Sequence, residues 1–214
     1  AWAIPLYKKH VENNYKFLEI AYRVILGIAL LLTVLPGLQF SSIYFRKDTR
    51  VQASEWIYEN IPAQSYILSE TANVVDIPVG LASVENKDYT VVSFNFYELD
   101  HPVEGQKLYR DLLYHLENAN YIFVPSRRIF ANYLRFPERY PRVNAYYQAL
   151  FSESGELGFE LIHTTSPCIH SVIRLCDEYA EETWTVFDHP VIRIYNKVTP
   201  KTREEYDKIL SQSE

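Results

Sequence analysis

The stretch that decides the fold is TVVSFNFYELDHPVEGQKLYRDLLYHLENANYIFVPS, residues 90–126. Its first part, Thr90–Tyr97, is rich in β-branched and aromatic residues and predicts a strand. Leu108, Leu112, Leu113 and Leu116 then recur at helical spacing, and the apolar run within 120–126 predicts a buried strand. A strand, a helix and a strand in this order form a βαβ unit, which implies a right-handed crossover and a parallel pair of strands.

The flanking segments add elements of the same kinds. The patterns predict helices over 49–60, 127–136 and 141–151, and strands over 65–70 and 158–165. They also predict a short strand or turn at 77–81, two strands around Asp188–Pro190 and a solvated helix in the tail, 199–214. The fold class is therefore α/β, a small sandwich with a mixed, partly parallel sheet.

A long uncharged segment precedes this α/β region. From Val24 to Phe45 the sequence VILGIALLLTVLPGLQFSSIYF contains no charged residue. As a helix, these 22 residues would be about 33 Å long, close to the thickness of the hydrocarbon core of a bilayer. We therefore predict one transmembrane helix over 17–45, with a buried helix of a soluble protein as the alternative. No small-residue cleavage site follows the apolar run, which argues against a signal peptide.

The apolar segment divides the chain into four parts. A polar N-terminal segment covers 1–16, the membrane helix 17–45, an extracytoplasmic α/β domain 46–199 and a helical tail 200–214. Four basic residues precede the uncharged run Val24–Phe45 and three follow it closely, so the positive-inside rule separates the two orientations weakly. We expect the N-terminus on the inside, the bilayer as a partner, and other membrane helices or subunits beside the span.

Composition excludes several classes of function. A net charge of −6 and a pI near 5.6 argue against a nucleic-acid-binding protein, which needs basic groups to neutralise phosphates. No GxGxxG or GxxxxGK[ST] motif occurs, so we expect no nucleotide cofactor. The histidines lack tight ligand spacing. His163 and His170 flank Cys168, but surface loop residues are the favoured interpretation there, and we expect no metal.

The cysteines and acidic residues leave alternatives open. Cys168 and Cys176 form a loop-closing disulfide if the domain faces an oxidising compartment, or are two buried thiols. Four carboxylates lie at strand ends, namely Asp76, Glu98, Asp100 and Asp188. Residues at such positions are more often caps, turn residues or surface charges, so we assign no catalytic residue.

An aromatic and arginine-rich stretch, RFPERYPRVNAYYQALF, covers residues 135–151. Val143, Tyr146, Tyr147 and Leu150 share one helical face, which favours packing on a sheet, while stacking of a sugar on Tyr146 or Tyr147 is the alternative. The arginines are the candidate contacts for a ligand or partner: Arg135, Arg139 and Arg142 in this stretch, and Arg127 and Arg128. The last two follow Ser126, where either an anion-binding corner or a helix cap is expected.

Several phrases of the sequence resemble one known family. They are ASEWIYENIP after the span, NANYIFVPS, RFPERYP, YYQALF, GELGFELI and WTVFDHPVIRIY. In this order they resemble the C-terminal end of membrane glycosyltransferases of the GT-C fold, the prokaryotic relatives of dolichyl-phosphate-mannose protein mannosyltransferases. The resemblance covers about 49–197 and the span before it. The SES at 152–154 and the cysteine loop depart from the pattern.

This resemblance implies a membrane-anchored accessory domain that is not catalytic by itself. In such enzymes the catalytic carboxylates lie in an outer loop of the multi-span portion, which has no counterpart here, and the donor is a lipid-linked sugar used outside the cytoplasm. The alternative is a single-span structural or accessory subunit of a larger membrane complex.

Overall fold

The computed structural model describes residues 3–71, 76–82, 87–167, 169–170, 174–175 and 178–211. The chain separates into two compact units, Ala1–Arg46 and Lys47–Glu214. Each unit is described by itself below.

The first unit is dominated by one long helix. Helix α1 (Ala3–Ser41) is followed by a short 3-10 helix, η1 (Ser42–Phe45). Within α1, Tyr15–Leu35 is long and apolar enough to cross a membrane, with a mean hydropathy of 2.1 and none of its most apolar window buried. The helix therefore also includes the polar residues that precede the uncharged run, and it continues through Pro36. The α-helical conformation ends four residues before the predicted end of the span at Phe45.

The second unit contains a five-stranded mixed sheet in the order β2-β1-β3-β7-β4. Its strands are β1 (Tyr66–Glu70), β2 (Thr90–Phe94), β3 (Tyr121–Val124), β4 (Phe159–Thr165) and β7 (Ile192–Lys197). Strand β1 pairs in parallel with β2 and β3, whereas β7 pairs antiparallel with β3 and β4. Two further strands, β5 (Ile169–His170) and β6 (Arg174–Leu175), form a separate antiparallel pair. The predicted mixed, partly parallel α/β sheet is confirmed.

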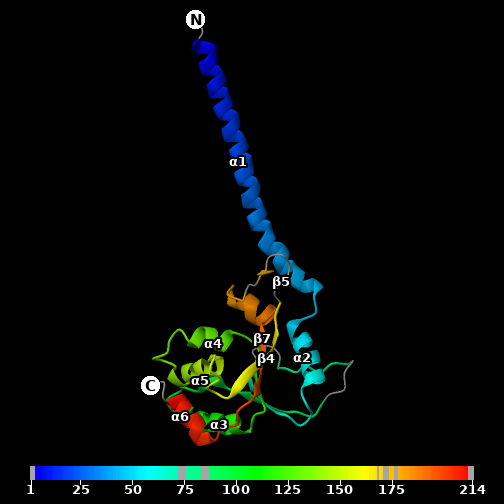
Figure 1. Ribbon diagram of the computed structural model, residues 1–214, viewed down its shortest axis with the longest axis vertical. Coiled ribbons are helices and arrows are strands. Elements are labelled where there is room, and N and C mark those ends of the chain that lie inside the picture. Colours follow the sequence, from blue (N-terminus) through cyan, green and yellow to red (C-terminus); the bar gives the residue numbers. More distant parts are fainter. Residues whose placement is uncertain are drawn as a thin grey trace. The chain divides into compact units, whose positions relative to one another are not determined.

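Helices cover both faces of this sheet (Figure 1). Helix α2 (Thr49–Asn60) covers one face. Helices α3 (Gly105–Asn118), α4 (Arg128–Tyr133), α5 (Pro141–Phe151) and α6 (Arg203–Ser211) gather on the other. Adjacent residues of β1 show the division: Ile67 belongs to the core beside α2, and Leu68 to the core beside α3 and α5. Side chains alternate between the two faces because successive residues of a strand point to opposite sides. Helix α3 carries the chain from β2 to β3, as in the predicted βαβ unit. The two strands are parallel but do not pair with each other, because β1 lies between them and pairs with both.

The first of the two strands predicted around Asp188–Pro190 is wrong. Thr183–Asp188 forms a π-helical turn, η3, and only the second predicted strand exists, as β7. The turn is held by hydrogen bonds that a strand pattern cannot anticipate. The Glu181 carboxylate accepts from the Trp184 amide at 3.3 Å, and Arg50 donates to the Val186 and Phe187 carbonyls at 3.1 and 2.6 Å. An arginine from a distant helix thus satisfies backbone oxygens that a sheet would otherwise pair.

The tail helix is present, but its predicted solvation is wrong. In α6, Tyr206 is fully buried and Leu210 is 3% exposed, and both belong to the core beside α3 and α5. Tyr206 and Leu210 lie four residues apart and so share one face of the helix. At 77–81, where a short strand or turn was expected, the described residues form bends and a cis Ile77–Pro78 peptide rather than a strand.

Candidate functional site

The site begins at the carboxyl edge of the parallel strands. From β1 the chain moves to β2 on one side, and α3 then returns it to β3 on the other side of β1. A topological switch point therefore lies between the ends of β1 and β3, and ligands of open α/β sheets bind at such points. Glu70 is the last residue of β1, and Ser126 follows β3.

Glu70 is the most perturbed acidic group at this edge. Its side chain is 2% exposed, and the Tyr147 hydroxyl donates to its Oε1 at 2.5 Å. Burial raises the pKa of Glu70 to about 8, against the opposing effects of the Tyr147 hydrogen bond and the nearby Arg193 guanidinium. At neutral pH this carboxyl group is therefore mainly protonated. Sequence reasoning missed Glu70, although a glutamate that ends a buried strand such as YILSE is a recognisable signal.

The basic residues after β3 are paired with an acidic segment of the same chain. Arg127 donates to the Glu178 carbonyl, and the Arg128 Nε lies 3.4 Å from a Glu182 carboxylate oxygen. Arg193, opposite Val124 in the β3–β7 pair, forms an ion pair with Glu178 at 2.5 Å.

Ser126 is not the N-cap residue of α4, a position that Arg127 occupies, but Ser126 does contact the first residue of that helix. Its hydroxyl oxygen accepts from the Arg128 amide at 3.3 Å. Because Arg127 and Arg128 already contact residues 178–182, less of their charge is available to an external anion. A contact of these two arginines with a ligand or partner stays a prediction.

The three arginines of residues 135–151 are not brought together. Arg142 donates to the Leu99 carbonyl at 3.3 Å, and its guanidinium lies 5.2 Å from the centre of the Tyr109 ring. Arg135 and Arg139 are exposed in the turn between α4 and α5, with Arg139 over the Tyr140 ring at 5.2 Å. Arg135 and Arg139 thus remain on the open surface, whereas Arg142 is partly buried against α3.

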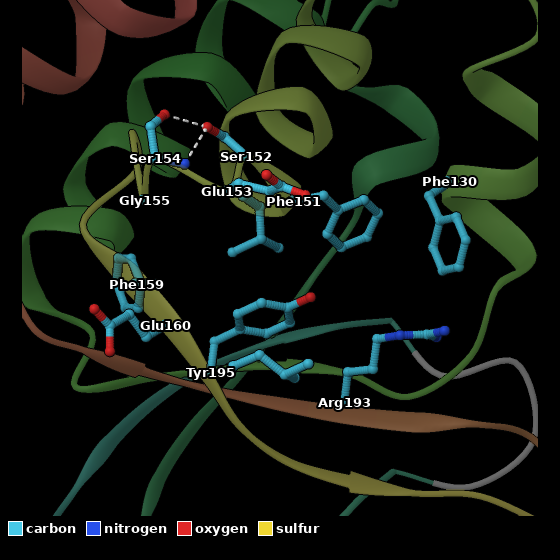
Figure 2. A pocket seen from close by; sticks show the side chains of 12 residues that line it. Phe130, Phe151, Ser152, Glu153, Ser154, Gly155, Phe159, Glu160, Arg193 and Tyr195 are labelled. Atoms are coloured by element: carbon cyan, nitrogen blue, oxygen red, sulfur yellow. Dashed lines mark hydrogen bonds between the residues drawn. The ribbon is translucent and has the colours of Figure 1, made fainter.

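A pocket of about 580 Å³ lies on the α4–α5 side of β4 and β7, and we call it the α5–β4 pocket (Figure 2). It is lined by Phe130, Leu150, Phe151, Ser152, Glu153, Ser154, Gly155, Phe159, Glu160, Leu161, Arg193 and Tyr195. Its volume is within the range of about 300–1,000 Å³ that is typical of small-molecule clefts. No candidate contact residue named from the sequence lines it, because the pocket is assembled by strand pairing between β4 and β7.

The polar groups of the α5–β4 pocket are of mixed character. Burial raises the pKa of Tyr195 to about 12, so its phenol is neutral at physiological pH. The Ser152 and Ser154 hydroxyls are hydrogen-bonded to each other at 2.5 Å, and the Glu153 and Glu160 side chains are exposed at the rim. The pocket therefore offers hydroxyls, carboxylates and one guanidinium around an aromatic floor.

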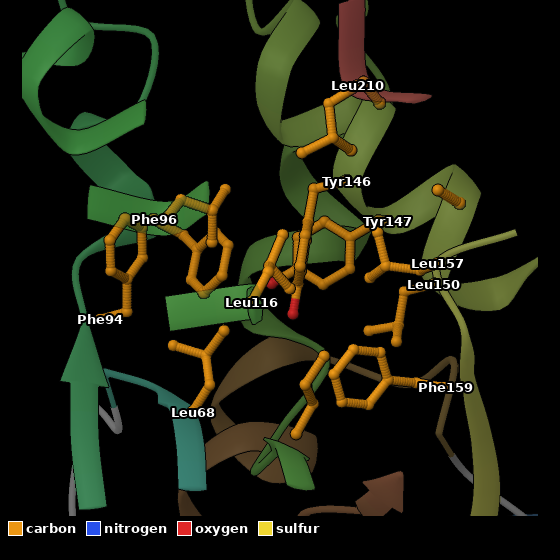
Figure 3. Close-up of a cluster of buried hydrophobic side chains, with 14 of the residues drawn as sticks. Leu68, Phe94, Phe96, Leu116, Tyr146, Tyr147, Leu150, Leu157, Phe159 and Leu210 are labelled. Carbon is orange, nitrogen blue, oxygen red and sulfur yellow. The ribbon is translucent and has the colours of Figure 1, made fainter. Parts of the chain in front are cut away.

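Tyr146 and Tyr147 are core residues. Both side chains are 0% exposed, and they pack with Phe96 of η2 (Phe96–Glu98), Leu116 and Leu210 (Figure 3). Packing on the sheet, which the spacing favoured, is thus the observed arrangement, and neither ring presents a face to a ligand. Tyr147 acts instead through its hydroxyl, which holds Glu70.

The two tyrosines are expected to respond differently to loss of the hydroxyl. Tyr147→Phe is expected to destabilise the protein by about 1–3 kcal/mol, because it leaves the buried Glu70 carboxyl without its partner. Tyr146→Phe is expected to be neutral or slightly stabilising, since the Tyr146 hydroxyl is buried without a hydrogen-bond partner in the described part of the chain. Urea unfolding of the full chain in nanodiscs at pH 6 measures both. Equal losses in the two variants would contradict the assignment.

The other acidic candidates do not form a site. Asp76, Glu98 and Asp188 are exposed. Asp100 caps α5, because its two carboxylate oxygens accept from the Arg142 and Val143 amides at 3.0 and 3.1 Å. The interpretation of such carboxylates as caps and surface charges therefore holds for these four.

The residues considered for a metal site, which was not expected, and for a disulfide are only partly covered by the described residues. His163 stacks on Trp56 with ring centroids 4.2 Å apart and beside a hollow of about 430 Å³. Among the described residues, no group of three His, Cys, Asp or Glu side chains is arranged to hold a metal ion. Cys168 and Cys176 lie outside the described residues, so their pairing stays a prediction.

Comparison of the chain with family models, with curated proteins and with solved structures found no match.

Proposed function

We propose that this chain is a membrane-anchored accessory region of a glycosyltransferase that uses a lipid-linked sugar, with the α/β domain outside the cytoplasm and the catalytic groups in another part of the enzyme. The anchor is the apolar part of α1, Tyr15–Leu35, whose most apolar window is not buried and whose length matches a bilayer. The enzyme class comes from the resemblance of the sequence phrases to GT-C glycosyltransferases.

One observation carries the proposal furthest. Three of the phrases that make up the resemblance, at 146–151, 155–162 and 184–195, meet around the α5–β4 pocket. Phe151 comes from the first phrase, Phe159 from the second, and Arg193 and Tyr195 from the third. The first two phrases are neighbours in the chain, and the third follows more than 20 residues later. The convergence of all three on one cavity supports a shared task in ligand handling.

The mass of the native polypeptide tests this proposal. In membranes of the source cells, an antibody to residues 47–214 is expected to detect a species well above 25.1 kDa, because the multi-span catalytic portion would be part of the same chain. Removing 47–214 from that polypeptide is expected to lower sugar transfer from a polyprenyl-phosphate donor without removing the protein from the membrane. Unchanged transfer after the deletion would reject the accessory role.

A single-span accessory subunit of a larger membrane complex is the second candidate. The observation that favours it is the bare apolar surface of α1, which suits packing against helices of other subunits as well as against lipid. A native mass near 25.1 kDa, with co-purification in fixed stoichiometry with a larger assembly, would select this candidate over the first.

A further inference from the structure

We propose that the α5–β4 pocket binds a neutral glycosyl unit through its aromatic floor and mixed polar rim, and that it excludes phosphate and other anions. This inference goes beyond the proposed function, because it stands on the pocket itself and applies equally to an enzyme region and to a free-standing subunit.

The aromatic side chains of the pocket provide flat surfaces that are similar in size to a sugar ring. Phe151 and Tyr195 lie with their ring centroids 6.3 Å apart and their planes inclined by 27°, and Phe130 meets Phe151 edge-on at 5.2 Å (Figure 2). Phe151 leaves 37% of its surface exposed, so ring surface remains open to a ligand. The face of an aromatic ring is electron-rich and attracts the polarised C–H groups on one side of a pyranose.

Two polar groups at the base of the pocket have unused hydrogen-bonding capacity. The Tyr195 hydroxyl has no hydrogen-bond partner among the described residues, and Figure 2 shows it directed toward the side of the pocket where Phe130 and Arg193 lie. The Arg193 Nη1 is buried and also unpartnered in the described part of the chain, although Nη2 is held by Glu178. A buried donor without a partner, such as Arg193 Nη1, is uncommon in folded proteins, and a bound ligand is one way to satisfy it.

The charges of the residues that line the pocket favour a neutral sugar over an anion. Glu153 and Glu160 place two carboxylates at the rim, while the single guanidinium, Arg193, is already paired with Glu178 at 2.5 Å. A phosphate would meet repulsion from both carboxylates, and the Arg193 guanidinium would offset little of it because Glu178 already balances its charge. Sugar hydroxyls both donate and accept hydrogen bonds, so they suit carboxylates, serine hydroxyls, a phenol and a guanidinium donor together.

The test is ligand-observed NMR on the full chain in lipid nanodiscs, which avoids detergents with sugar head groups. The probes are the methyl glycosides of mannose, glucose and galactose, with inorganic phosphate as the anionic comparison. We expect saturable, millimolar binding of at least one glycoside and no competition by phosphate. Phe151→Ala and Tyr195→Phe are each expected to weaken that binding about fivefold or more. Glu160→Gln, at an exposed position, is expected to weaken it without disturbing the fold.

The matched control is Phe136→Ala, which removes a phenyl ring of 59% exposure from the α4–α5 turn, outside the pocket. It is expected to leave glycoside binding unchanged, and unfolding curves confirm that each variant is folded. Absence of saturable binding for all three glycosides would overturn the inference, as would equal binding by the pocket variants. If phosphate bound to the protein and the same variants weakened that binding, the ligand of the pocket would be an anion and not a neutral sugar. None of these outcomes depends on the length of the native polypeptide, so the pocket and the proposed function fail separately.

Discussion

Replacing Glu70 with glutamine is expected to make the protein more stable than the wild type at pH 8.5, and to change its stability little at pH 5. The wild-type carboxyl group is 2% exposed, and its pKa is raised from 4.5 to about 8 by burial. Glutamine has nearly the same shape, accepts the Tyr147 hydrogen bond in the same way and cannot ionise. The variant therefore removes only the cost of charging this site.

The direction of the pH dependence follows from the raised pKa. Between pH 4.5 and about 8 the unfolded chain has lost the Glu70 proton while the folded chain retains it, so stability falls as pH rises through this window. The slope is about 1.4 kcal/mol per pH unit for one proton, which amounts to a loss on the order of 5 kcal/mol over the whole window. Below pH 4.5 the contribution of this group is fully present.

Denaturant unfolding of the full chain in nanodiscs measures this effect from pH 5 to 9. Tryptophan fluorescence follows the transition, since Trp56 and Trp184 lie in the α/β domain. The wild-type midpoint should fall with pH more steeply than that of Glu70→Gln, and the two curves should separate as pH rises. Glu160→Gln is the matched control, because Glu160 is exposed, and its profile should parallel the wild type. Parallel profiles for Glu70→Gln and the wild type would show that Glu70 ionises normally.

Placing two arginines in the middle of the apolar helix is expected to abolish membrane integration. Ile28 and Leu31 lie within Tyr15–Leu35, one helical turn apart and more than half exposed. Each arginine near the centre of a membrane helix costs about 3 kcal/mol on insertion scales. The one acidic residue of the span, Glu19, lies more than two helical turns before Ile28 and is already paired with Arg23, so it does not offset this cost. Ile28→Arg with Leu31→Arg should therefore shift the protein from the membrane fraction to the soluble or degraded fraction.

Alkaline carbonate extraction of expressing cells distinguishes the two outcomes. The control, Tyr44→Arg with Phe45→Arg, adds the same charge beside Arg46, where basic residues reach the interface, and should remain resistant to extraction. If the central arginines left the protein equally resistant, α1 would not be its membrane anchor.

Local patterns in the sequence were sufficient to predict the helices and strands that depend mainly on neighbouring residues. The uncharged run predicts a long helix, the leucine spacing in 105–118 predicts α3, and Pro141 at the first position of α5 marks its start. The βαβ order indicated that β2 and β3 run parallel, because a strand, a helix and a strand have few ways to pack. It did not indicate that β1 lies between them and forms both parallel pairs. The amphipathic face of α5 likewise indicated correctly that Tyr146 and Tyr147 point inward.

Features that depend on distant partners could not be predicted in this way. Thr183–Asp188 has the composition of a strand, but it forms a π-helical turn whose carbonyls are bound by Arg50, more than 130 residues earlier. From the sequence, Asp100 was interpreted only as a carboxylate at a strand end. In the structure its oxygens accept hydrogen bonds from the Arg142 and Val143 amides at the start of α5. In both cases the observed structure depends on a hydrogen bond between residues far apart in the sequence. The local spacing of apolar residues carries no information about such a bond.

By itself, then, the sequence determined the α/β class, the parallel strands and a helix able to cross a membrane, because these follow from which side chains leave water at what spacing. Only the tertiary structure decided what the edge of the sheet contains. It buried Glu70 against Tyr147, and it set Phe151, Phe159 and Tyr195 around one pocket. Burial of a charge and the shape of a cavity depend on the pairing of strands far apart in the chain, so they exist only once the whole domain has packed.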